Sequence, residues 1–81
     1  MTPAETRILN SFWHKGRKEF VPLTHDEVHR RSDVPKMSVA GMLRNLKSEG
    51  LMSSMHGERG EITTYELTET AKRIVFGSIL G

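Results

Sequence analysis

The sequence contains no cysteine and no long apolar run, and each absence excludes a class of protein. Without cysteine, the 81-residue chain has no disulfide framework, thiolate zinc ribbon, iron–sulfur cluster or cysteine nucleophile. No apolar stretch approaches the ~20 residues that span a bilayer, and the polar segment after Met1 does not resemble a signal peptide. We therefore expect a cytoplasmic protein that has no membrane partner.

The length allows one small domain over residues 1–81. With 36% hydrophobic and 27% charged residues, the composition is that of a globular protein. A domain of this size buries roughly 60% of its unfolded surface, so its core is thin and a second chain would stabilise it.

The net charge is only +2, but the basic residues are unevenly distributed. Residues 1–50 hold nine basic and six acidic side chains, whereas residues 51–81 hold three and four. Five basic residues lie between Val28 and Ser48, with Asp33 as the single opposing charge: Arg30, Arg31, Lys36, Arg44 and Lys47. Such a cluster favours a polyanionic partner, although solvated helix faces carry similar charges.

A capping box predicts the start of the first helix. In the segment 2–5, Thr2 supplies the capping hydroxyl, a proline occupies the first helical position, and Glu5 stands three residues after the cap. We expect this helix to end at about His14 or Lys15, before Gly16.

A second capping box, Thr24 to Glu27, follows an extended segment over 20–23. Because Pro22 has no N–H to donate, this segment is predicted to be a short edge strand or a connector. The second helix is predicted to end at about Arg31.

A tight turn over 32–34 leads to a third helix that is predicted to begin at Pro35 and continue to Glu49. Gly50 is the expected left-handed cap. Four apolar residues share the inward face: Val39, Met42, Leu43 and Leu46.

After Gly50 the spacing of the apolar residues changes from that of a helix to every second residue, which is the spacing of a strand. The runs 51–56 and 61–67 predict a hairpin with its connection at 57–60. Thr68 is the expected cap of a final helix that ends at Gly77 or continues toward Leu80. Its predicted inner residues are Ala71, Ile74 and Val75.

This order predicts an α+β, mainly α, winged helix-turn-helix domain. The helix-turn-helix covers about 24–49, the wing about 51–67 and the C-terminal helix about 69–77. The segments 34–51 and 65–71 resemble the recognition helix and the wing-to-helix junction of the multiple-antibiotic-resistance-regulator (MarR) class. The resemblance implies a DNA-binding transcriptional regulator. Gly41 departs from the polar or basic residue usual at its position, and the long dimerisation helices of that class have no counterpart.

The outward face of the third helix is the predicted DNA-reading surface. The residues expected to read bases are Met37, Ser38, Arg44 and Asn45. An Arg suits guanine, an Asn suits adenine, and an apolar side chain suits the thymine methyl. The expected phosphate contacts are Arg31, Lys36 and Lys47.

The hairpin tip is a second candidate contact with DNA. Arg59 could enter a minor groove, with His56 on a phosphate. Glu58 and Glu61 oppose this role, so a plain solvated turn is the alternative.

Apolar residues outside the main helical stripes predict a homodimer through the terminal helices. They are Leu9, Trp13, Phe76 and Leu80. The alternative is that the first helix packs in a groove between its neighbours and that the last helix frays.

A metal site is a weaker interpretation of the histidines. His25 and His29 share a helix face at i, i+4 spacing, and His14 or His56 could supply a third ligand. The second residue of the segment is Asp26, where a zinc protease helix has Glu. We expect no metal, no cofactor and no catalytic residues, and the sequence does not identify a small-molecule effector.

The main functional prediction is therefore transcription regulation through double-stranded DNA. The alternative is a winged-helix interaction module that docks another protein in a replication, transcription or segregation complex. The weak net charge, Gly41 and the acidic hairpin tip favour that alternative.

Overall fold

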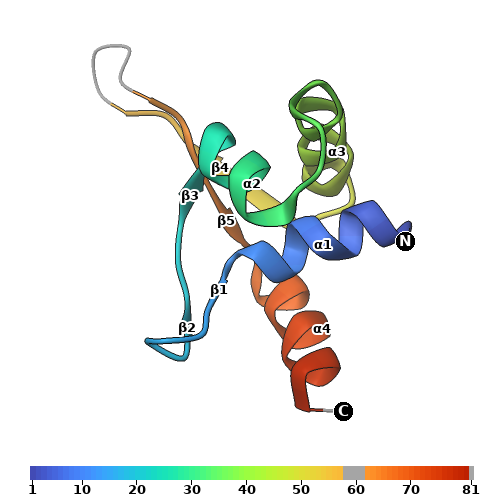
Figure 1. Ribbon diagram of the computed structural model, residues 1–81, viewed down its shortest axis with the longest axis vertical. Coiled ribbons are helices and arrows are strands. Elements are labelled where there is room, and N and C mark those ends of the chain that lie inside the picture. The colour runs from blue at the N-terminus through green and yellow to red at the C-terminus, as the bar shows by residue number, and fades with distance from the viewer. Residues whose placement is uncertain (58–61, 81) are drawn as a thin grey trace.

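The computed structural model describes residues 1–57 and 62–80 of the chain. Helices α1–α3 group together, and the β4–β5 hairpin and α4 extend from them in different directions (Figure 1). The elements in chain order are α1 (Pro3–Ser11), β1 (Trp13–His14), β2 (Glu19–Phe20), β3 (Leu23–Thr24), α2 (His25–Ser32), α3 (Lys36–Ser48), β4 (Met52–Met55), β5 (Thr64–Leu67) and α4 (Glu69–Leu80). In the described part of the chain, no helix is long and apolar enough to cross a membrane.

Helix α1 begins as predicted but ends earlier. The Thr2 hydroxyl accepts from the Glu5 N–H at 3.2 Å, which confirms the capping box. The helix stops at Ser11 because the next residues pair as strand β1 with β2, Trp13 opposite Phe20. The rings of these two aromatic residues lie 5.0 Å apart in an edge-on arrangement. The expected end at His14 or Lys15 is therefore wrong, since strand pairing replaces the last helical turn.

The predicted extended segment 20–23 is divided between the end of β2 and the start of β3, and β3 is an edge strand that pairs with the wing. The sheet order is β3-β5-β4, with Leu23 opposite Tyr65 and Thr24 opposite Thr64. On the other side of β5, Ser54 of β4 lies opposite Tyr65. The predicted hairpin is confirmed in its strands, which are shorter than expected, while residues 58–61 lie outside the described residues.

The turn between α2 and α3 is fixed by local hydrogen bonds. Asp33 has a φ of 60°, which ends α2 in the left-handed region. The His29 Nδ1 atom lies 2.7 Å from the Val34 carbonyl oxygen, and Nδ1 carries the proton because a carbonyl only accepts. Pro35 is the N-cap rather than the first helical residue, so α3 begins one position later than predicted, at Lys36. Gly50, with a φ of 76°, is the left-handed residue expected after the helix.

The core lies where α1 meets the other three helices and the sheet. Leu9 is 1% exposed within the single chain, so its prediction as a dimer contact is wrong. Helix α1 contacts α2, α3 and α4 together, which buries Leu9 as well as Ile8, as in the alternative of packing in a groove between its neighbours. Ile74 is 45% exposed, so its prediction as an inner residue of α4 is also wrong. The buried core residues are Ile8, Leu9, Phe12, Leu23, Val28, Val34, Val39, Leu43, Leu46, Leu51, Met52, Leu67, Ala71 and Val75.

Helix α4 begins at the predicted cap and continues beyond Gly77 to Leu80. The Thr68 hydroxyl accepts from the Ala71 N–H at 3.4 Å and donates to the Gly50 carbonyl at 2.7 Å. Helix, turn, helix, hairpin and helix thus follow one another in the order that the sequence predicts for a winged helix-turn-helix domain.

Candidate nucleic-acid interface

Helix α3 is divided lengthwise into a buried and an exposed face. Val39, Leu43 and Leu46 are buried in the core, and Met42 is half-buried against it. The opposite face is open to solvent, and Met37 at its start is 96% exposed. The exposed residues of this face are Lys36, Met37, Ser38, Ala40, Gly41, Arg44, Asn45, Lys47 and Ser48. We call this set the outer face of α3.

The hairpin strands form a groove with the outer face of α3. The groove encloses about 230 Å³, and its lining residues are Ala40, Leu43, Arg44, Lys47, Ser54, His56, Thr63 and Tyr65. Lys47 Nζ donates to the Ser54 hydroxyl at 2.7 Å, which links α3 directly to β4. His56 Nδ1 lies 3.0 Å from the Thr63 hydroxyl. The structure therefore brings together three predicted site residues, Arg44, Lys47 and His56.

Three groove residues from the hairpin are absent from the predicted site: Ser54, Thr63 and Tyr65. Their part in the groove depends on how the hairpin strands pair, with Ser54 opposite Tyr65 and Met55 opposite Thr64. The alternation of side chains along both strands can be read from the sequence, but the register in which the two strands pair cannot.

Lys36 stands at the start of α3, next to the end of α2. Its ammonium lies 3.7 Å from the Asp26 carboxylate, which also accepts from Arg30 at 3.2 Å. All three side chains are more than half exposed. Exposed ion pairs contribute little to stability, so a stronger anion competes easily for Lys36.

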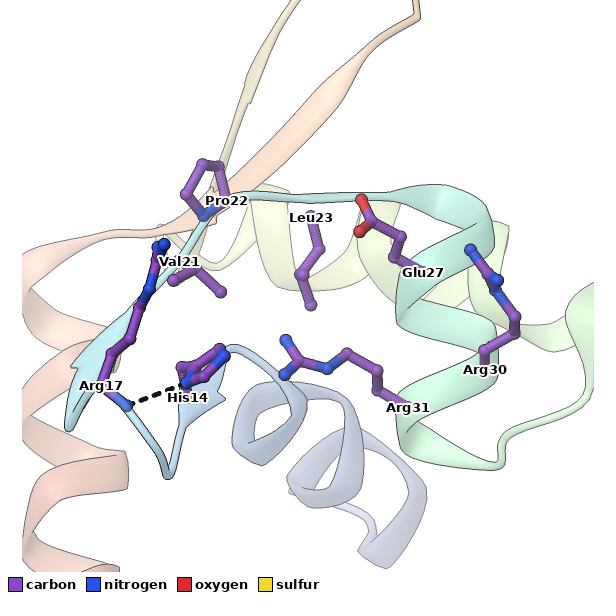
Figure 2. A pocket seen from close by; sticks show the side chains of 8 residues that line it. All are labelled: His14, Arg17, Val21, Pro22, Leu23, Glu27, Arg30 and Arg31. Carbon is purple, nitrogen blue, oxygen red and sulfur yellow. Dashed lines mark hydrogen bonds between the residues drawn. The ribbon is translucent and has the colours of Figure 1, made fainter.

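Arg31 has a different position from the other predicted phosphate contacts. It extends from α2 toward His14 of β1 (Figure 2), and the two residues line the same two cavities. It does not line the groove beside α3. Its role as a phosphate contact remains a prediction from the sequence.

The remaining predicted contacts are those of the wing tip and of the dimer interface. Arg59 lies outside the described residues, as does the side chain of Leu80. Trp13 packs edge-on against Phe76 of α4 at 5.8 Å between ring centroids, and Phe76 remains 43% exposed. The predicted dimer residues Trp13 and Phe76 are therefore neighbours.

Three of the four histidines form hydrogen bonds within the domain. His29 Nδ1 holds the turn, His14 Nδ1 accepts from the Arg17 N–H at 3.0 Å, and His56 contacts Thr63. Within the described residues, no group of three His, Cys, Asp or Glu side chains could hold a metal ion.

Comparison with known proteins gives a structural match without a close relative. No family model matches the chain, and no curated protein matches it. TubR from Bacillus thuringiensis serovar israelensis, solved bound to 24 bp of tubC, superposes with a TM-score of 0.83 at 17% identity, over 95% of this chain and 80% of TubR.

Two further solved structures superpose on nearly the whole chain. BpsR from Bordetella bronchiseptica, described by the regulation of its DNA binding by 6-hydroxynicotinic acid, gives a TM-score of 0.81 at 18% identity over 98% of this chain. The adhesin competence repressor AdcR from Streptococcus pyogenes gives 0.75 at 19% identity over 95% of this chain. The chain spans little more than half of BpsR (57%) and AdcR (54%). By its element order and by these superpositions, the chain has the winged helix-turn-helix fold.

Proposed function

We propose that this protein is a DNA-binding transcriptional regulator that places α3 in the major groove and the β4–β5 hairpin against the adjacent backbone. The observation that carries the proposal is the division of α3 into a buried face and an exposed face. One face is core, and the other presents small residues, one Arg and one Asn with nothing of the described chain covering them. A major groove about 12 Å wide admits such a helix. A regulator of this kind works in the cytoplasm of a microbe, where the DNA lies.

The outer face of α3 divides into base-reading and phosphate-binding residues. Arg44 suits the guanine O6 and N7 atoms, and Asn45 suits the adenine N6 and N7 atoms. Met37 and Ser38, in the first turn, are assigned to a thymine methyl and a base edge. All four side chains are exposed.

Lys36 and Lys47 are assigned to phosphates at the two ends of the helix. Lys47 already donates to Ser54, so its ammonium is held between α3 and the hairpin, where a phosphate oxygen can join the Ser54 hydroxyl as acceptor. His56 lies in the same groove and supplies a further donor. Arg59 and Arg31 remain candidates on the grounds of sequence alone.

We also propose that the chain forms a homodimer through the aromatic surface made by Trp13, Phe20 and Phe76. Phe20 and Phe76 line one apolar hollow on α4, and Trp13 packs edge-on against both rings. Regulators with two-fold symmetry bind paired half-sites that lie about one helical turn of DNA apart, so a dimer fits the proposed function. Light scattering at high micromolar concentration tests this, and a clean 9.2 kDa species would contradict it.

The proposed function is tested by a salt titration of binding to mixed-sequence duplex DNA, followed by selection of a preferred site. Contacts with several phosphates predict an affinity that falls steeply with salt concentration. Arg7, which is exposed on α1, supplies a matched control, since Arg7→Ala removes the same charge away from α3. If binding is absent, or does not depend on salt, the protein-docking alternative replaces this proposal.

A further inference from the structure

One carboxylate lies at the start of the proposed DNA-reading helix, and the proposed function gives it no role. Asp26 belongs to the first turn of α2 and is exposed. Its two oxygens contact different residues: Oδ1 lies 3.7 Å from the Lys36 Nζ atom, and Oδ2 lies 3.2 Å from the Arg30 Nε atom. The carboxylate therefore links the two helices of the helix-turn-helix and stands beside a lysine that is assigned to a DNA phosphate.

The position of Asp26 within α2 accounts for only one of these two contacts. An acidic residue in the first turn stabilises a helix through the helix dipole, and the pair with Arg30 spans one helical turn. The cap of α2 does not need Asp26, because the Thr24 hydroxyl and the Glu27 carboxylate form the capping box. The contact with Lys36 of α3 is therefore additional to what α2 requires.

The two lysines that are assigned to phosphates differ in what surrounds them. Lys47 Nζ donates to the neutral Ser54 hydroxyl, and among the described residues no carboxylate lines the groove beside it. Lys36, in the part of the chain that the structure describes, pairs with Asp26 and with no other acidic side chain. A phosphate that approaches Lys47 meets neutral neighbours, whereas one that approaches Lys36 also meets a negative charge.

The strength of the pair indicates competition rather than a permanent block. Exposed ion pairs are individually weak, so Asp26 does not hold Lys36 against a polyanion. Its charge nevertheless stays close: the ammonium is 3.7 Å from the carboxylate, so a phosphate in contact with Lys36 lies within roughly 10 Å of Asp26, the distance over which about 0.1 M salt screens charges only partly. The phosphate is attracted by the lysine and repelled by the aspartate, so the net gain from Lys36 is smaller than that from Lys47.

We propose that Asp26 is an intramolecular competitor of the DNA phosphate at Lys36 and thereby limits the affinity of the protein for the DNA backbone. The inference rests on the proposed function, since it places α3 against duplex DNA. Because Asp26 acts on a phosphate contact, it lowers the affinity for all sequences alike and leaves the choice of bases to the outer face of α3.

The test compares Asp26→Asn with the wild type in salt titrations on random duplex and on the preferred site, measured by fluorescence anisotropy. Asn keeps the shape of Asp without its charge, so the substitution frees Lys36 for the DNA backbone. We expect the affinity to rise about three- to tenfold on both duplexes, because the charge pairs involved are exposed and individually weak. The salt slope should increase by up to about one unit, the amount for one further phosphate contact.

A matched control and a second pair of variants assign the effect to the contact with Lys36. Glu69→Gln also removes an exposed carboxylate from the first turn of a helix, one that lies 3.5 Å from Lys72 in α4, and it should leave the affinity unchanged in samples of equal oligomeric state. Asp26→Asn should gain little in a protein that already carries Lys36→Gln.

Lys36→Gln alone gives a second measurement, which does not require that the Asp26 variant folds. It should weaken binding to random duplex less than Lys47→Gln does, since Asp26 already offsets part of the charge of Lys36. An equal or larger loss for Lys36→Gln would contradict the inference.

The outcomes separate this inference from the proposed function. If the wild type binds DNA in a salt-dependent way and Asp26→Asn binds no more tightly, the inference is overturned and the proposed function stands. A gain on one sequence alone also overturns it, because Asp26 would then read a base, as a carboxylate does at cytosine N4. If neither protein binds duplex DNA, the proposed function fails and this inference fails with it.

Discussion

Gly41 is a glycine in the middle of an exposed helix face. Its replacement by alanine is expected to change the stability of the domain and its affinity for DNA in opposite directions. A glycine in a helix interior destabilises it by about 0.8–1 kcal/mol relative to alanine. A Cβ added at Gly41 meets nothing within 4 Å, so no contact inside the domain requires the glycine. The full helix-propensity gain is therefore expected for Gly41→Ala, which corresponds to a rise of roughly 4–8 °C in Tm per kcal/mol for a domain of this size.

The same substitution should weaken the DNA complex. If the outer face of α3 lies against base edges, a methyl group at Gly41 separates the helix from the groove floor, at a cost of about 1–3 kcal/mol by analogy with overpacked cores. That is a loss of roughly 5- to 150-fold in affinity for the preferred site, measured by fluorescence anisotropy at fixed salt.

Gly77 provides the matched control. It lies in α4, where an added Cβ also meets nothing within 4 Å, so Gly77→Ala should raise the Tm similarly without adding a methyl group to the outer face of α3. Because Gly77 borders the hollow proposed as the dimer surface, DNA affinity is compared for variants that have the same oligomeric state by light scattering, and is then expected to be unchanged for Gly77→Ala. If Gly41→Ala stabilises the protein and binds DNA as the wild type does, the glycine has no role at a DNA surface, and the proposed docking of α3 is refuted.

Further predictions concern individual side chains of the helix-turn-helix. Arg44→Ala should cost about 1–3 kcal/mol at the preferred site and relax one base position, and an unchanged ratio of specific to random binding would contradict the assignment. Lys47→Gln should weaken binding to all sequences alike and lower the salt slope by about one unit, measured by titration on random duplex. Thr24→Ala removes the cap of α2 and should lower the free energy of unfolding by about 1 kcal/mol in urea. The pKa of Glu27 lies below its ordinary value of 4.5, so its stabilising contribution is present above that value and is lost as the pH falls through the lowered pKa. Glu27→Gln should therefore reduce the acid sensitivity of unfolding, and an unchanged pH profile would contradict this account.

The features predicted correctly from sequence are those whose causes are local. The capping boxes at Thr2 and Thr24 depend on residues three apart, and both are present in the structure. The same holds for Gly50, whose left-handed conformation follows the end of α3. Helix starts, the turn and the inward face of α3 could therefore be predicted without knowledge of the fold.

The wrong predictions concern features that depend on distant parts of the chain. Helix α1 ends early because Trp13 pairs with Phe20, and a helical wheel contains no information about that partner. Leu9 appears unpartnered on the wheel, yet it is buried because three other helices surround α1. The position of Arg31 beside His14 likewise depends on the β1–β2 hairpin, whose first strand the sequence predicts to be the end of the first helix.

Thr24 belongs to two elements at once. Its backbone pairs with Thr64 in the sheet, and its hydroxyl accepts from the first turn of α2, which in turn holds Val34 through His29. If the proposed function holds, a displacement of the hairpin on a duplex would reach Thr24 through β5, and from Thr24 the residue that precedes Pro35 through α2 and His29. Shortening or stiffening the hairpin should consequently alter which base sequences the protein prefers, even at positions that the hairpin never touches.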